Sequence, residues 1–150
     1  MKKFQFKYQA VLKERKVKEE FALELLAEAQ HAYQAEVDQK IKLIEMLNQS
    51  QNRKENLGRT PVQIHEFQSE QAFITGTKQR ILQSDQRIFK ARKSVDRAMK
   101  GYLQAKRRTE IMKDLKEKFY QEYRKERNQF EQKQLDDMVV MRAHLKEDLL

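Results

Sequence analysis

One apolar position recurs every seven residues through the second half of the chain. The recurring residues, before Thr109 ends the run, are Phe67, Ile74, Ile81, Ile88, Val95 and Tyr102. A spacing of seven is typical of a coiled coil, in which two helices supercoil around a shared apolar seam. We place the second core position of this seam at the mostly polar residues Gln71, Lys78, Asp85, Arg92 and Met99. The pattern therefore predicts a long helix with a narrow seam.

Towards both ends of the chain, apolar residues show a longer spacing. Residues eleven apart are Val11, Ala22, Tyr33 and Ile44 in the first half, and Phe119, Phe130 and Met141 near the C-terminus. An eleven-residue repeat follows a nearly straight or slightly right-handed helix. We therefore expect the seam to be loosely wound at the chain ends.

Most of the helix-breaking chemistry lies in one short stretch around Pro61, the one proline of the chain. Gly58 can close a helix in the left-handed conformation. Thr60 is then a suitable N-cap, Pro61 falls at the first helical position, and Gln63 completes a Thr-x-x-Gln capping box. We predict one all-α domain over 1–150, with a helix over about 4–57, a turn over about 58–60 and a helix over about 61–148. The two helices would form an antiparallel coiled-coil hairpin.

The composition fits long, half-exposed helices. The chain is 39% hydrophobic and 37% charged, which is too polar for a multilayer core and too periodic for disorder. No apolar run approaches the roughly 20 residues that span a bilayer. The basic start is followed by charged residues, so we do not expect a secretory signal. The absence of cysteine gives no indication of an oxidising compartment.

The charge is unevenly distributed. Basic residues exceed acidic ones by four over 1–20 and by ten over 77–125. Acidic residues exceed basic ones by three over 21–76 and by two over 126–150. If the chain folds back near Gly58, two basic stretches share one end of the hairpin and its tip is acidic. Such a field steers anionic partners, although a simply solvated surface would show the same excess.

The two predicted helices differ in length, at about 80 Å and about 130 Å. The first helix would be used up opposite roughly residue 115 of the second. We therefore expect the rest of the second helix to lack an internal partner, including Phe119, Tyr123, Phe130, Met138 and Met141. Apolar residues on such an overhang indicate a binding partner or self-association, the alternative being a solvated tail.

No pattern indicates an active site. His31, His65 and His144 stand alone without metal-ligand spacing, and the three glycines are too far apart to cradle a phosphate. Adjacent carboxylates on a helix point about 100° apart and have no cleft that would raise a pKa. We expect no catalytic residue, no cofactor and no metal, and therefore no enzyme activity.

Three other hypotheses fit a chain of this kind. One is nucleic-acid binding, with Tyr102 stacking on a base and a set of basic residues tracking phosphates. The basic residues are Lys90, Arg92, Lys93, Arg97, Lys100, Lys106, Arg107 and Arg108. The second is an adaptor that other proteins grip, which explains the overhang, the interrupted seam and the segregated charge together. The third is an extended parallel homodimer, which the break between Gly58 and Pro61 disfavours.

Motifs along the whole chain resemble those of the flagellar export protein FliJ family. The start resembles the family's aromatic residues followed by Q-x-V-L-x-x-R, and here reads Phe4-Gln5-Phe6-Lys7-Tyr8-Gln9-Ala10-Val11-Leu12-Lys13-Glu14-Arg15. Near the end, Glu131-Gln132-Lys133-Gln134-Leu135-Asp136-Asp137 is similar to the family's E-Q-K-x-L-D-E, with Arg142 downstream. The Phe73-Ile74 pair ahead of a long polar helix also fits. Gly76-Thr77 departs from the family, which usually has helix-forming apolar residues there, so we expect a break near Gly76.

The resemblance implies a two-helix coiled coil similar to the central stalk subunit of rotary ATPases. It implies a cytoplasmic protein at the inner face of the membrane that links a hexameric export ATPase to the cytoplasmic part of the export gate. Some members of the family also handle export chaperones. A stalk of a virulence-type secretion system is the nearest alternative. We assign Phe119, Tyr123, Phe130 and Met138 to the ATPase ring, and Phe73 and Ile74 to the gate.

Overall fold

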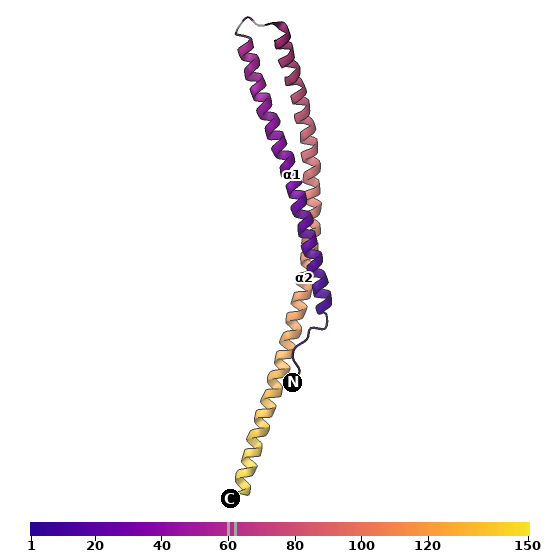
Figure 1. Cartoon of the computed structure of the whole chain (residues 1–150). Helices are drawn as coiled ribbons and strands as arrows, with labels where there is room; N and C mark the ends of the chain where they lie inside the picture. Colours follow the sequence, from indigo (N-terminus) through magenta and orange to yellow (C-terminus); the bar gives the residue numbers. More distant parts are fainter. Residues whose placement is uncertain (60, 62) are drawn as a thin grey trace. The chain divides into compact units, whose positions relative to one another are not determined.

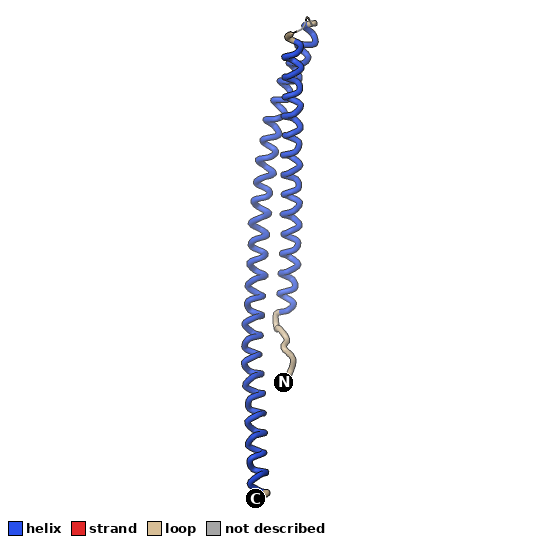
Figure 2. Tube along the Cα trace, turned by 90° about the vertical axis from the view of Figure 1, so that its left-hand side faces the viewer, coloured by secondary structure: helices blue, strands red, loops and turns tan. Residues whose placement is uncertain are grey.

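A computed structural model describes all residues of the chain except 60 and 62. It contains two helices, α1 over Gln9–Leu57 and α2 over Ile64–Asp148, and the described residues include no strand. The chain divides into two compact units. Unit 1 consists of Met1–Glu19 and Ala105–Leu150, and unit 2 consists of Glu20–Gln104. Within unit 2, α1 and α2 lie side by side and run antiparallel (Figure 1 and Figure 2). The predicted all-α fold of two long antiparallel helices is confirmed.

The first helix begins later than the sequence suggested. α1 starts at Gln9 instead of about residue 4, and the Gln9 amide donates to the Phe6 carbonyl at 3.2 Å as the first turn forms. The residues before it have no regular structure because their aromatic side chains pack against α2, as described below. The end of α1 at Leu57 agrees with the prediction.

The turn between the helices differs from the predicted one. Gly58 does not adopt the left-handed conformation, and its amide donates to the Lys54 carbonyl at 3.1 Å. α2 begins at Ile64, three residues after Pro61, and the Glu66 amide donates to the Gln63 carbonyl at 3.1 Å. The predicted N-cap, Thr60, lies outside the described residues.

The expected break near Gly76 is wrong, since α2 is helical throughout this stretch. The hydroxyl of Thr77 donates to the Phe73 carbonyl at 2.8 Å, and that of Thr75 donates to the Gln71 carbonyl at 3.0 Å. Both bonds satisfy the hydroxyls one turn back within the helix. A single glycine in such a setting lowers helix stability without ending the helix.

Most buried and half-buried residues follow alternating steps of three and four along both helices, and we call those that do seam residues. In α1 they are Leu12, Arg15, Glu19, Ala22, Leu26, Ala29, Tyr33, Glu36, Lys40, Leu43, Leu47, Ser50, Lys54 and Leu57. In α2 they are Glu70, Ile74, Thr77, Ile81, Ser84, Ile88, Ala91, Val95, Ala98, Tyr102, Ala105, Thr109, Met112, Lys116, Phe119 and Tyr123. This spacing is that of a heptad seam with a left-handed supercoil. The predicted seven-residue stripe faces inward from Ile74 onward, whereas Phe67 is exposed.

Two predictions about the seam are wrong. The second core position lies three residues after the apolar one, at residues such as Thr77, Ser84 and Ala91, and not four residues after it. The expected core residues Gln71, Lys78, Asp85, Arg92 and Met99 are all exposed. The eleven-residue spacing fails as well, because Val11, Ile44, Phe130 and Met141 are exposed. Because seam residues such as Glu19 and Lys40 are polar, the apolar residues of α1 alone do not show its heptad spacing.

The seam buries little apolar surface, because many of its residues are small or polar. Four hydroxyl residues are almost fully buried, namely Ser50, Thr77, Ser84 and Thr109. The Thr109 hydroxyl donates to the Arg15 carbonyl at 3.1 Å, and the Ser50 hydroxyl pairs with the Glu70 carboxylate. Ser84 Oγ has no hydrogen-bond partner among the described residues. Because few large apolar side chains are buried, we expect low stability for helices of this length.

Candidate protein-binding surface

Charged pairs fix the register of the two helices in unit 2. Arg53 Nε contacts Glu70 Oε1 at 3.0 Å, Arg87 Nε contacts Glu36 Oε2 at 3.1 Å, and Lys40 pairs with Asp85. The paired residue numbers add up to 123 for Arg53–Glu70 and Glu36–Arg87, and to 125 for Lys40–Asp85. Because the sums differ by only two residues, the register holds along this part of the seam without a bulge.

The Glu70 carboxylate is held by two residues of α1, Ser50 and Arg53. A hydrogen bond from the Ser50 hydroxyl lowers the pKa of Glu70, and the Arg53 guanidinium adds to the effect. Both partners come from α1 and stabilise the ionised carboxylate. Glu70 therefore links the two helices close to the turn as an anion.

In unit 1 the first eight residues pack along α2. The Phe4 ring lies 5.3 Å from the Tyr120 ring and 5.5 Å from the Tyr123 ring, measured between centroids. The Phe6 ring lies 5.8 Å from that of Phe119. Phe6 also joins Leu12 and Met112 in the buried core of this unit. The non-helical N-terminal segment therefore continues the cover that α1 gives to α2.

Because the N-terminal segment covers this part of α2, the overhang begins later than predicted. Phe119 and Tyr123 were expected to lack an internal partner, but both are half-buried. Phe119 contacts Phe6 and Tyr8, and the Tyr123 hydroxyl donates to the Lys2 carbonyl at 2.8 Å. The sequence contained a signal for this arrangement. Phe4, Phe6 and Tyr8 alternate with polar residues, which is typical of an extended segment that packs one side.

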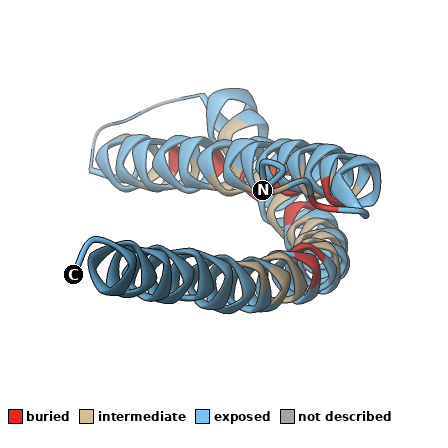
Figure 3. Cartoon of the chain, turned by 90° about the horizontal axis from the view of Figure 1, so that it is seen from below, coloured by how far each residue is buried: buried red, intermediate tan, exposed pale blue. Residues whose placement is uncertain are grey.

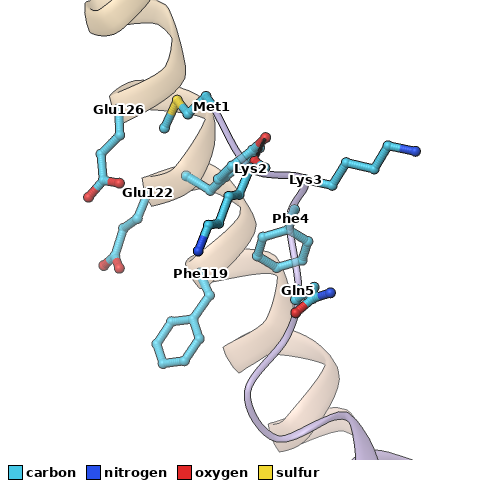
Figure 4. Close-up of a pocket in the computed structure, with 9 residues that line it drawn as sticks. Met1, Lys2, Lys3, Phe4, Gln5, Phe119, Glu122 and Glu126 are labelled. Atoms are coloured by element: carbon cyan, nitrogen blue, oxygen red, sulfur yellow. Dashed lines mark hydrogen bonds between the residues drawn. The ribbon is translucent and has the colours of Figure 1, made fainter.

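A shallow groove of about 470 Å³ lies between the N-terminal segment and α2. Its lining residues are Met1, Lys2, Lys3, Phe4, Gln5, Phe119, Glu122, Tyr123 and Glu126. Figure 4 shows Glu122 and Glu126 projecting from α2, whereas Lys3 points away from the helix. The groove thus combines aromatic rings with side chains of both charges, as protein-binding surfaces do.

Beyond Tyr123, every residue of α2 is exposed (Figure 3). Phe130 and Met138, both predicted to bind a partner, expose 44% and 50% of their surface. The other large apolar residues exposed in this tail are Leu135, Val139, Val140, Met141, Leu145, Leu149 and Leu150. Among the described residues, no other segment of the chain covers these side chains, so the tail offers an uncovered apolar helix surface.

The seam does not simply continue into the tail. Continuing the steps of three and four after Tyr123 gives Glu126, Phe130, Lys133, Asp137, Val140, His144 and Glu147, which are mostly polar. The apolar residues Leu135, Met138 and Leu145 lie on a different side of the helix. The tail is therefore patterned for a partner other than an extension of α1.

The two residues assigned to the gate have different positions. Phe73 is exposed to 37%, whereas Ile74 is a buried seam residue at 4%. The structure therefore places Phe73 on the surface and Ile74 against α1. A partner at this site can reach Phe73 directly, but Ile74 only by separating the helices.

Within the described part of the chain, no cluster of three His, Cys, Asp or Glu side chains could hold a metal ion. The described residues also include no helix that is long and apolar enough to cross a membrane. What the geometry does provide is a two-helix coiled coil with a groove and an uncovered helical tail.

The comparisons with known proteins define the family. The chain belongs to the FliJ family, because the family model described as "Flagellar FliJ protein" matches residues 4–148. The resemblance drawn from the sequence is thereby confirmed, and the chain is a protein associated with type III export. A solved structure from Chlamydia trachomatis, CT670, described as a YscO homologue, is similar in fold. It shares 16% identity at a TM-score of 0.53, covering 97% of this chain and 99% of that chain. No curated protein matches the chain.

Proposed function

We propose that this chain is a non-enzymatic stalk of the flagellar export apparatus that links the hexameric export ATPase to the cytoplasmic part of the export gate. The observation that supports this role is the uncovered tail of α2 after Tyr123, joined to a coiled coil of the FliJ family. A helix that presents apolar residues without an internal partner is suited to insertion into a ring of subunits. The protein would act in the cytoplasm, at the inner face of the membrane.

The ATPase site would lie on the tail, and its four predicted residues would have two different roles. Phe130 and Met138 are exposed and would contact the ring directly. Phe119 and Tyr123 hold the N-terminal segment, so they would shape the groove at the base of the tail. Lys2, Glu122 and Glu126 in that groove provide polar contacts for the same partner.

The gate site lies in unit 2, on the exposed ring of Phe73. Ile74 would contribute by fixing the position of this stretch of α2 against α1. Export chaperones are candidate partners of the same unit, which contains the acidic stretch of the chain.

The decisive measurement is the oligomerisation of the export ATPase in the presence of the full chain. Phe130→Ala should weaken association by about tenfold or more, because burying such a side chain is worth about 1.5–3 kcal/mol. Helix content and melting temperature should hardly change, since Phe130 is exposed. Lys133→Ala, three residues away, is the matched control and should have little effect. Unchanged affinity for the Phe130 variant would show that the ring does not bind this tail.

The structural similarity to the YscO homologue supports a second candidate, a stalk of a virulence-type secretion system. The two candidates make different predictions about the partner. Binding to a flagellar export ATPase, and failure to bind one from a virulence-type system, would favour the first candidate. The reverse result would favour the second.

Nucleic-acid binding by the basic residues of α2 is the remaining alternative. Tyr102 is a half-buried seam residue and is therefore poorly placed to stack on a base. Counterion release would make such binding weaken steeply with salt. A tight, sequence-selective complex with DNA or RNA at physiological salt would contradict the stalk proposal.

A further inference from the structure

Unit 2 exposes more apolar side chains on one of the two broad faces of its helix pair than on the other. In both helices these side chains directly follow a seam residue, as Phe89 follows Ile88 and Leu103 follows Tyr102. In an antiparallel pair, equivalent heptad positions of the two helices lie on the same broad face. We call the following set the apolar face: Leu23, Val37, Ile41 and Ile44 of α1, and Leu82, Phe89, Met99 and Leu103 of α2.

These residues are large and most are well exposed. Leu82 and Phe89 each expose 60% of their surface, and Leu103 exposes 53%. On the opposite broad face, residues that directly precede a seam residue are more polar in α2, for example Lys90 and Arg97. The large apolar residues exposed there are fewer, namely Phe21, Leu25, Met46 and Phe73. The asymmetry between the faces indicates that one of them is covered by another molecule.

We infer that the apolar face of unit 2 binds a second copy of this chain, so that two hairpins form a four-helix bundle. The two-fold axis would run parallel to the helices. Each α1 would then lie beside the α2 of the other copy and run antiparallel to it. This inference concerns unit 2 alone and does not rest on the proposed function, which uses the tail in unit 1.

Apolar side chains of the two copies match along the new contact. When residue numbers across the new contact add up to 126, Leu23 meets Leu103 of the second copy. At the same sum, Val37 meets Phe89 and Ile44 meets Leu82. Polar residues also meet each other, with Gln30 opposite Asp96 and Gln34 opposite Arg92. The exception is Ile41, which meets Asp85.

The register needed for this match is almost the one already present within each chain. Paired residues within unit 2 add up to 123 or 125 in the ion pairs Glu36–Arg87 and Lys40–Asp85. A two-fold axis parallel to the helices leaves every residue at its own level. The contact with the second copy therefore keeps the register present within each chain, and residues whose numbers add up to 126 lie within about 5 Å of the same level.

The charges of α1 and α2 are complementary across the new contact. Over 20–46, α1 has six acidic and two basic residues, whereas α2 over 78–100 has eight basic and two acidic residues. Packing α1 against the α2 of the other copy brings opposite charges together, and packing like helices would not. At the rim of the new contact, Glu24 lies near the level of Lys100 of the second copy. Neither residue forms an ion pair within the described part of its own chain.

Sedimentation equilibrium of the full chain tests the inference, from about 1 µM to about 1 mM, where modest interfaces dissociate. The wild-type chain should form a dimer in this range. Phe89→Gln should weaken the dimer at least about tenfold while circular dichroism shows unchanged helix content. Leu103→Gln is a second variant on the same face and should act in the same direction. A wild-type chain that is monomeric throughout would overturn the inference and leave the face to a different partner.

Phe21→Gln is the matched control, because Phe21 is also 60% exposed but directly precedes the seam residue Ala22, on the opposite broad face. It should leave the dimer unchanged. Equal weakening by the Phe21 and Phe89 variants would show non-specific apolar association and overturn the assignment of the face.

A charge exchange tests the arrangement of the helices. Glu24→Lys and Lys100→Glu should each weaken the dimer about threefold at low salt, since each places like charges together. The double variant should regain wild-type affinity, because the pair is restored with its signs exchanged. A double variant that is weaker than either single variant would contradict the placement of α1 beside the second copy's α2.

Discussion

The Tyr123 hydroxyl donates a hydrogen bond of 2.8 Å to the backbone carbonyl of Lys2, which ties the start of the chain to α2. The Phe4 ring packs against Tyr123 at 5.5 Å between centroids. The N-terminal segment is therefore held by one hydrogen bond and a set of aromatic contacts. Its docking determines where the uncovered part of α2 begins.

Removing the Tyr123 hydroxyl or the Phe4 ring should weaken the docking of the N-terminal segment to different extents. Tyr123→Phe should cost about 0.5–1.5 kcal/mol of docking free energy, the usual net value of one hydrogen bond. Phe4→Ala should cost more, because it removes the aromatic contacts. Since Phe4 is partly exposed, we expect a cost of up to about 3 kcal/mol. Amide hydrogen exchange of Gln9 and Leu12, whose amides donate to the Phe6 and Tyr8 carbonyls, measures both. Unchanged protection in the Phe4 variant would show that the segment is held by other contacts.

Two exposed glycines, Gly76 and Gly101, lower the stability of helix α2. Nothing lies within 4 Å of a Cβ built on Gly76 or Gly101. Each replacement by alanine should stabilise the protein by about 0.5–1 kcal/mol, because glycine loses more backbone entropy in a helix. Thermal unfolding should show a higher Tm for both variants. Gly58→Ala is the comparison, and its Cβ would lie 3.4 Å from the Glu55 carbonyl, so a smaller gain is expected.

Ser84→Ala should also stabilise the protein. Ser84 is fully buried and its hydroxyl has no partner among the described residues, so removing it relieves a desolvation cost of about 1 kcal/mol. Ser94→Ala is the matched control in the same helix, because the exposed Ser94 hydroxyl donates to the Lys90 carbonyl at 3.2 Å and its removal relieves no buried, unpaired group. Denaturant unfolding should show the larger gain for Ser84. Equal gains would mean that the buried hydroxyl carries no penalty.

The lowered pKa of Glu70 makes part of the stability depend on pH. Its folded-state pKa lies below the ordinary value of 4.5, so its contribution is fully present above about pH 4.5. The contribution should be lost as the pH falls through the folded-state pKa, where the carboxylate becomes protonated. Comparing unfolding of wild type and Glu70→Gln against pH measures this. The two curves should converge in acid, and a constant difference would contradict the assignment.

The sequence predicted the helices better than their contacts. Ile74, Ile81 and Ile88 recur every seven residues, and this pattern alone identified the inward side of α2. The second core position was missed because Ser84 and Ala91 are small and do not stand out in an apolar pattern. A step of four residues is as compatible with a heptad as a step of three, so spacing could not decide between them.

The candidate site could be predicted only in part. The exposed tail follows from the unequal lengths of the helices, and Phe130 and Met138 are where the sequence placed them. The cover over Phe119 was not predicted, because Phe4 and Phe6 were assigned to the first helix. An extended segment reaches about 3.3 Å per residue, more than twice the rise of a helix, so it covers a longer stretch of α2.

The Lys40–Asp85 pair has a consequence for loads applied along the coiled coil. Two helices with a heptad seam can slide past each other most easily in steps of seven residues, which restore the fit of the side chains. Such a step would move Lys40 from Asp85 to Lys78 or to Arg92, depending on its direction. Either position brings two positive charges together at the edge of the seam. Slipping by one heptad within unit 2 is therefore disfavoured in both directions at the same lysine.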